Sequence, residues 1–191
     1  MAALLVFIAN GSQAMIAAAI YGLSLSALLG TSAAYHRINW TPKARAWMRR
    51  LDHTMIFVLI AGTYTPFGML KLGDRLGFIV LVSMWSAVGA GVVLKLVWLS
   101  APKWLVAILY VATGWMSVWV APEMIAATGV LCVTLIGIGG ALYTVGALIY
   151  AMKRPNPIPG VFGYHEVFHA LVIAAALVHY IAIAIYVLPT C

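Results

Sequence analysis

Charged residues are scarce in this sequence. Lys, Arg, Asp and Glu together make up 8% of the 191 residues, only four of these are acidic, and 65% of the chain is hydrophobic. The mean hydropathy is +1.06. A soluble domain cannot enclose so large an apolar share, because its water-facing surface needs polar side chains. The composition therefore predicts an integral membrane protein.

Cysteine is almost absent. Cys132 and Cys191 are the only two, so the chain has neither a disulfide framework nor a Cys-x-x-Cys metal motif. Strands of about ten alternating residues are missing as well, which excludes a transmembrane barrel. The N-terminal "MAALLVFIAN" lacks the basic region of a signal peptide. We interpret the net charge of +7 as a topology signal and expect no nucleic-acid partner.

Apolar runs long enough for helices recur along the chain. They cover residues 1–9, 12–36, 54–70, 76–97, 104–120, 124–151 and 165–188. A bilayer core of about 30 Å needs roughly 20 apolar residues per helix. The run 1–9 is too short to cross it, so we expect the chain to begin within its first transmembrane helix. The sequence predicts an all-α bundle of seven transmembrane helices, the first one partial, forming a single transmembrane domain over residues 1–191.

Basic residues are concentrated in alternate loops. If the first helix starts inside, nine fall in cytoplasmic loops and two outside: Arg37, Lys43, Arg45, Arg49, Arg50, Lys95, Lys103, Lys153 and Arg154 against Lys71 and Arg75. Because Lys and Arg collect in cytoplasmic loops, the N-terminus is predicted to be cytoplasmic and the C-terminus outside. The amphipathic "RINWTPKARAWMRR" is expected to lie along the inner surface.

Polar residues of three helices converge near that surface. Ser32 and His36 lie one turn apart at the cytoplasmic end of the second span, and Asp52 opens the third span. His165 and His169, also one turn apart, open the last span. Ionisable groups in membrane helices are energetically unfavourable and usually functional. Their shared depth predicts one site.

Three imidazoles, a water molecule and a nearby carboxylate form the arrangement of a catalytic zinc site, in which the metal lowers the pKa of its water to about 7. Asp52 could orient the water, ligate the metal directly, or hold a ligand histidine by a hydrogen bond. Each residue also has a purely structural interpretation. His165 and His169 could meet lipid headgroups, Asp52 could cap the third span, and Ser32 could bond to the carbonyl at i−4.

The remaining histidines are less suited to this site. His53 points about 100° away from Asp52 on a helix, which favours an interfacial or supporting role over metal ligation. His179 lies ten residues beyond His169, about 15 Å deeper, and is expected to be a buried, hydrogen-bonded histidine.

Glu166 completes a His-Glu-x-x-His pattern with His165 and His169. In zinc hydrolases with this pattern on a helix, the glutamate is the general base. The alternative is a carboxylate in the first helical turn, stabilised by the helix dipole.

Three blocks of the sequence resemble a known family. "SAAYHR", "RRLDHTMIFVLIAGTYTPF" and "GYHEVFHALVIAAALVHY" are similar to signature blocks of the bacterial hemolysin III family, which is grouped with the progestin and adipoQ receptors and the alkaline ceramidases. The resemblance implies a seven-helix bundle in the bacterial inner membrane with zinc at its cytoplasmic end. It further implies that His36, His165 and His169 bind zinc, that Asp52 positions the water, and that Ser32 lies beside it.

Three functions follow as hypotheses. The first is a zinc-dependent hydrolase of lipid amides, ceramide-like, in which Asp52 moves the proton and Ser32 donates to the oxyanion. The second is a non-enzymatic membrane protein, either a pore-forming cytolysin or a receptor with structural zinc. The third, an intramembrane metalloprotease, needs an acidic ligand on a later helix, and the motif already lies on the last one. The lipid bilayer is the expected partner, and the sequence predicts no oligomeric state.

Overall fold

The computed structural model describes residues 2–98 and 101–189. The side chains of Lys95 and Lys103, which entered the basic-residue count, and Cys191 lie outside the described residues. Within these ranges the chain is helical and has no β-strand. Six helical stretches are long and apolar enough to cross a membrane: Ser12–Arg37, Pro42–Leu70, Asp74–Leu94, Trp104–Thr128, Val130–Met152 and Tyr164–Tyr186. The protein is therefore an all-α, multi-pass membrane protein, as its composition predicts.

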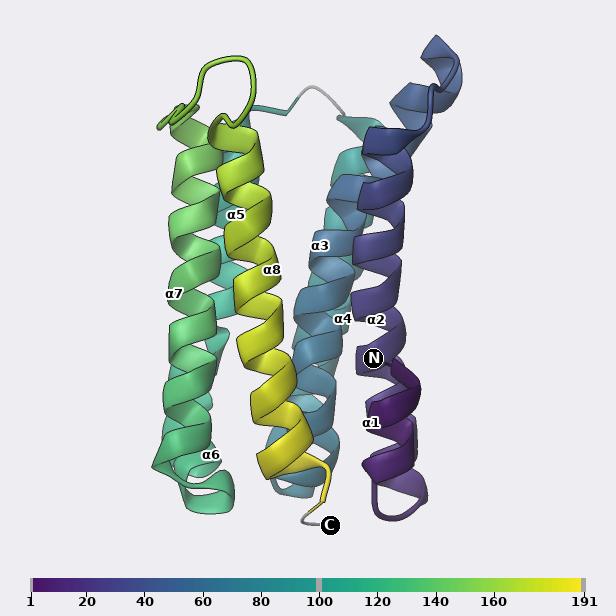
Figure 1. Cartoon of the computed structure of the whole chain (residues 1–191). Helices are drawn as coiled ribbons and strands as arrows, with labels where there is room; N and C mark the ends of the chain where they lie inside the picture. The colour runs from purple at the N-terminus through teal and green to yellow at the C-terminus, as the bar shows by residue number, and fades with distance from the viewer. Residues whose placement is uncertain (1, 99–100, 190–191) are drawn as a thin grey trace. The chain divides into compact units, whose positions relative to one another are not determined.

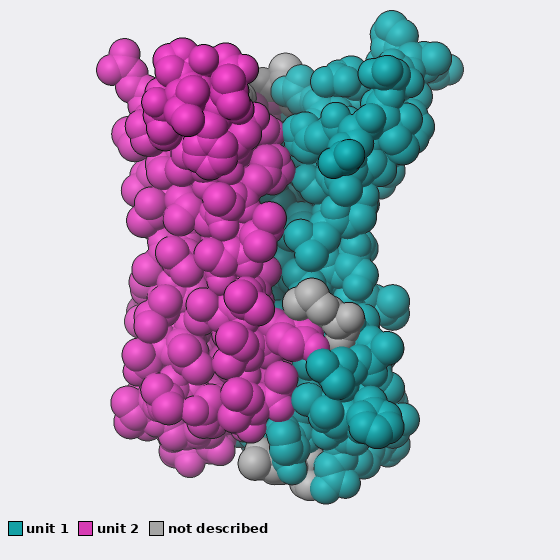
Figure 2. Space-filling view, in the orientation of Figure 1, with its two compact units in different colours: residues 1–100, 187–191 teal, residues 101–186 magenta. Residues whose placement is uncertain are grey.

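The helices fall into two compact units, residues 1–100 with 187–191 and residues 101–186 (Figure 2). The first unit contains α1 (Ala2–Ile8), α2 (Ser12–Arg37), α3 (Pro42–Leu70) and α4 (Asp74–Val97). Each of these helices packs on the next along the chain. The seventh span and the orientation of the termini stay predictions.

Helices α2 and α3 form an antiparallel hairpin that brings their backbones close together (Figure 1). Buried Ser24 faces Gly62, where a β-carbon would overlap the serine hydroxyl. Small residues permit such close approach of membrane helices. This contact sets the register of the hairpin, so residues equally distant from it along the two helices lie at about the same depth.

Helix α3 begins earlier than the predicted span 54–70. Thr41 is its N-cap and accepts a hydrogen bond from the Ala44 N–H at 3.4 Å, and Pro42 occupies the first turn, where no backbone N–H is needed. Residues 42–50, which we expected along the inner surface, are thus continuous with the third span. Asp52 lies ten residues into the helix, so the alternative that it caps the third span is wrong.

The second unit contains α5 (Lys103–Gly114), the 3₁₀ turn η1 (Trp115–Val120), α6 (Ala121–Thr128), α7 (Val130–Met152), α8 (Tyr164–Ala182) and most of the π-helical η2 (Ile183–Val187). The predicted break between spans 104–120 and 124–151 is wrong. Helical structure continues through Pro122, which lies in the first turn of α6, and ends at Gly129. Gly129 has a φ of +83°, a backbone conformation that glycine adopts without strain.

Candidate metal centre

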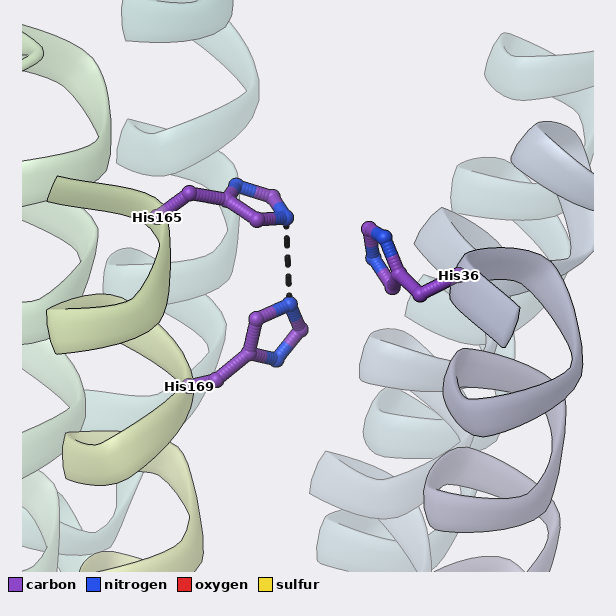
Figure 3. Close-up of side chains that lie close together, drawn as sticks. All are labelled: His36, His165 and His169. Atoms are coloured by element: carbon purple, nitrogen blue, oxygen red, sulfur yellow. Dashed lines mark hydrogen bonds between the residues drawn. The ribbon is translucent and has the colours of Figure 1, made fainter. Parts of the chain in front are cut away.

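Two histidines meet at the start of α8. His165 and His169 are four residues apart, which places them on one face of the helix, one turn from each other. Their Nε2 atoms are 3.1 Å apart, and their rings are nearly perpendicular, with an interplanar angle of 84° (Figure 3). One ring can donate this hydrogen bond and the other accept it, depending on the tautomers.

The first turn of α8 is held by two hydrogen bonds to its backbone. The Gly163 N–H donates to Glu166 Oε2 at 2.9 Å, and the Tyr164 N–H donates to Asn156 Oδ1 at 3.0 Å. These acceptors satisfy N–H groups that have no partner within the helix. They anchor the turn from which His165 projects.

Aromatic rings pack around the pair. The Tyr150 ring on α7 lies 5.8 Å from the His165 ring, and the Phe168 ring lies 5.3 Å from that of His169, between ring centroids. Both histidines are half-buried. The neighbouring rings limit their rotation, so the two Nε2 atoms are positioned by packing as well as by helix spacing.

The separation of these nitrogens fits a metal ion. Two imidazole ligands at 2.0–2.1 Å from a tetrahedral zinc lie about 3.3 Å from each other, close to the observed 3.1 Å. A neutral pair sharing one proton fits this distance as well. The pair is therefore suited to contribute two ligands, and a metal ion would take the place of the shared proton.

The other candidate residues lie at one end of the α2–α3 hairpin, in the first unit. Asp52 precedes Gly62 by ten residues, and the midpoint between Ser32 and His36 follows Ser24 by ten residues. Because Ser24 faces Gly62 in an antiparallel pair, Asp52 lies at about the depth of Ser32 and His36. The sequence-based expectation of a shared depth therefore holds within this unit.

Asp52 and His53 have different surroundings. The Asp52 side chain is 16% exposed, and its Oδ2 atom lies 3.9 Å from Nδ1 of His53. His53 uses this nitrogen to donate to the Arg49 carbonyl at 2.7 Å. That bond orients the His53 ring along its own helix and occupies its Nδ1 atom.

Ser32 differs from the other serines of α2. Ser24 and Ser26 donate to the carbonyls four residues earlier, Ile20 and Gly22, at 2.7 and 2.8 Å. Within the described residues Ser32 makes no hydrogen bond. The alternative that Ser32 bonds to its own helix is therefore wrong, and its half-buried hydroxyl is available to another group.

His179 is the buried, hydrogen-bonded histidine that was expected. It is 7% exposed, and its Nε2 atom donates to the Ile136 carbonyl of α7 at 3.0 Å. Its ring occupies the space beside Gly139, where a β-carbon would overlap it. It lies more than two helical turns beyond His169 and contributes to the packing of α7 against α8.

Figure 3 draws the three predicted zinc ligands, His165 and His169 on α8 and His36 on α2. Within the second unit the structure brings His165 and His169 together, and within the first it brings Ser32, His36 and Asp52 to one depth. The ligand set that combines the two units stays a prediction. Tyr150 and Asn156 support the pair and were missed, because neither residue belongs to a recognisable motif.

Comparison with known proteins gives consistent matches. Residues 1–180 match the family described as Haemolysin-III related. The chain is 31% identical to the Hemolysin-3 homolog of Bacillus subtilis over 185 residues, 96% of this chain and 84% of that protein. It is 29% identical to Hemolysin-3 of Bacillus cereus, covering 98% and 85%. It is 26% identical to the monocyte to macrophage differentiation factor of Homo sapiens, covering 88% and 69%.

Proposed function

We propose a function on the premise that this chain belongs to the haemolysin-III-related family. The protein is proposed to be a zinc-dependent membrane hydrolase that cleaves the amide bond of a lipid. His36, His165 and His169 would hold the metal. The observation that carries the proposal is the 3.1 Å separation of the His165 and His169 Nε2 atoms, which suits two ligands of one tetrahedral ion.

His36 is proposed as the third ligand because of its position on α2. It lies on the last turn of the helix, one turn beyond Ser32, and its side chain is exposed within the structure. Three histidine ligands leave the fourth position of a tetrahedral ion open, which is the arrangement of catalytic rather than structural zinc. The bound metal would supply a Lewis acid that polarises the amide carbonyl and makes water easier to deprotonate.

Asp52 and Ser32 supply the remaining chemistry. The Asp52 carboxylate accepts a proton from the attacking water, the water oxygen bonds to the amide carbon, and the C–N bond breaks. Asp52 then returns the proton to the nitrogen of the leaving amine, so the products are a fatty acid and an amine. The unbonded Ser32 hydroxyl donates a hydrogen bond to the carbonyl oxygen as negative charge develops there.

A lipid substrate is proposed because of the depth of the site. His165 and His169 belong to the first turns of the apolar stretch Tyr164–Tyr186, and Asp52 belongs to the stretch Pro42–Leu70. Groups at this position near the end of membrane spans can meet the carbonyl region of a bilayer lipid without drawing the acyl chains into water. An N-acylated lipid such as a ceramide presents its amide there.

The test measures metal and product together. Purified full-length protein is assayed for bound zinc and for fatty acid released from a panel of N-acylated lipids. We expect wild-type protein to bind about one zinc per chain and to release fatty acid, and we expect His169→Ala to lose both. His53→Ala is the matched control, since His53 bonds to the Arg49 carbonyl instead.

If His169→Ala and His53→Ala both keep their zinc, the proposed metal site is refuted. Zinc bound without release from any lipid would refute the hydrolase and favour a structural metal. X-ray absorption at the zinc edge separates these outcomes independently of substrate, because a structural ion has four protein ligands and a catalytic ion has a water-derived oxygen.

A second function is suggested by the name of the relative from Bacillus cereus, Hemolysin-3. If the chain forms pores, liposomes that contain it should release an entrapped dye, and His169→Ala should release it equally well. Leakage that needs His169, or no leakage at all, counts against a pore.

A further inference from the structure

A basic segment joins α2 to α3 and continues into the first turns of α3. Residues 37–51, named here the basic segment, contain five of the eleven Lys and Arg residues of the chain and no Asp or Glu. These five are Arg37, Lys43, Arg45, Arg49 and Arg50. Among the residues that the structure describes, no carboxylate forms an ion pair with any of them. The segment is therefore a surface of uncompensated positive charge.

The length of α3 places this segment outside the hydrocarbon core. At 1.5 Å per residue the 29 residues of α3 span about 43 Å, whereas a bilayer core is about 30 Å thick. The apolar part of the helix, residues 54–70, occupies the core. The ten residues 42–51 then extend into the headgroup layer or the water beside it.

Basic and apolar side chains occupy separate sectors of this part of the helix. At 100° per residue, Lys43, Arg45, Arg49 and Arg50 fall within a sector of about 160°. The adjoining sector carries Trp47 and Leu51, which are 51% and 45% exposed, and Ile38 in the turn before the helix is 49% exposed. A basic sector beside exposed large apolar side chains is typical of a helix that lies at a lipid interface rather than in free solvent.

Two guanidinium groups are held by aromatic rings. The Arg45 guanidinium lies over the Tyr35 ring at 5.3 Å, and that of Arg50 lies over the Trp47 ring at 4.8 Å. A stacked guanidinium keeps its N–H edge free for the paired hydrogen bonds that arginine makes to phosphate. Arg49 lies one helical turn from Arg45, and both side chains are exposed.

We propose that the basic segment binds the headgroups of anionic phospholipids in the leaflet at this end of α2 and α3, with Arg45 and Arg49 as the phosphate-binding pair. Charge complementarity identifies the occupant, because five cations without a carboxylate attract a lipid that carries net negative charge. The exposed Trp47 and Leu51 fit a lipid source of phosphate, since they would gain nothing from a free ion in water. The inference goes beyond the proposed hydrolase and does not depend on a metal.

The test uses the full-length protein with two lipids of different charge. Protein is equilibrated in mixed detergent micelles of phosphatidylglycerol and phosphatidylcholine, and retained lipids are counted by native mass spectrometry. We expect retention of phosphatidylglycerol over phosphatidylcholine. Arg45→Gln/Arg49→Gln should lower this preference roughly tenfold, and added salt should lower that of the wild type, because the attraction is electrostatic.

Three comparisons keep the outcome decisive. Lys71→Gln/Arg75→Gln removes the same charge from the end of α3 and the start of α4, and it should leave the preference unchanged. Arg45→Lys/Arg49→Lys retains the charge and should retain most of the preference, which also verifies that variants at these positions fold. An excess of inorganic phosphate should not displace phosphatidylglycerol. Equal retention of both lipids, equal loss in the two glutamine variants, or displacement by phosphate would each overturn the proposal.

Discussion

Gly139 shows how strongly one residue can constrain this membrane protein. The His179 ring on α8 occupies the volume in which a Gly139 side chain would lie, and it bonds to the Ile136 carbonyl one turn away. The polar ring thereby satisfies part of its hydrogen bonding inside a protein interior that contains few polar partners. The neighbouring Gly140 faces open space.

Gly139→Ala should destabilise the protein by about 1–3 kcal/mol, because its methyl group overlaps a buried ring that is held by a hydrogen bond. Gly140→Ala, one residue away, should be neutral or slightly stabilising, since alanine favours a helix more than glycine does. Thermal unfolding midpoints of the two variants in the same detergent test this difference. Equal midpoints would show that α7 and α8 pack less closely at His179 than the structure indicates.

Ser32 offers a second prediction at this scale. If its hydroxyl donates to the developing oxyanion, Ser32→Ala should slow lipid-amide cleavage about 10²–10³-fold while bound zinc stays unchanged. Ser26→Ala is the matched control on the same helix, because the Ser26 hydroxyl already donates to the Gly22 carbonyl. A similar loss in both variants would indicate a general effect on α2 rather than a role in the reaction.

At the scale of the element, the start of α8 explains how a His-Glu-x-x-His pattern can carry a glutamate with a structural task. Glu166 accepts from the Gly163 N–H, so its carboxylate closes the first turn of the helix. His165 lies in this first turn and His169 lies in the next, so that their rings face one another. The glutamate thus stabilises the helix end from which His165 projects.

Glu166→Gln should therefore keep both zinc and activity within a fewfold of wild type, because a glutamine side chain still accepts from the Gly163 N–H. Glu166→Ala should lose about 0.5–2 kcal/mol of stability, the usual effect of losing a cap. Turnover and thermal midpoints measured on both variants test the assignment. If Glu166→Gln keeps its zinc but turns over about a hundredfold more slowly, Glu166 is a general base instead.

At the scale of the whole molecule, the proposed ligand set draws on both compact units, since His36 belongs to one and His165 with His169 to the other. A ligand that binds only the folded state stabilises it by mass action, by about 3 kcal/mol when free metal exceeds its Kd a hundredfold. Binding of the proposed metal is therefore measurable as a gain in stability.

Chelation should lower the thermal midpoint of the wild-type protein and leave that of His36→Ala nearly unchanged. His53→Ala, which lies in the same unit as His36, should respond to the chelator as the wild type does. Midpoints with and without chelator for the three proteins provide the measurement. A full chelator effect in His36→Ala would remove His36 from the ligand set and leave a site formed by α8 alone.

Much of this protein followed from sequence, because composition and hydrophobic runs are local properties. The scarcity of charge and six of the apolar runs established an all-α membrane protein before any contact was known. The spacing of His165 and His169 predicted a shared helical face, and the position of His179 ten residues beyond His169 separated it from the site.

The tertiary structure decided what depends on contacts between helices. The pairing of Ser24 with Gly62 set the depth of Asp52, and the partner of His179 proved to be a carbonyl of α7. Local backbone geometry moved a helix break to Gly129, since Pro122 is tolerated in a first turn whereas a positive φ ends a helix. Helical spacing showed which polar residues share a face of one helix, such as His165 and His169, but the register between helices is set by packing, which no single run of residues contains.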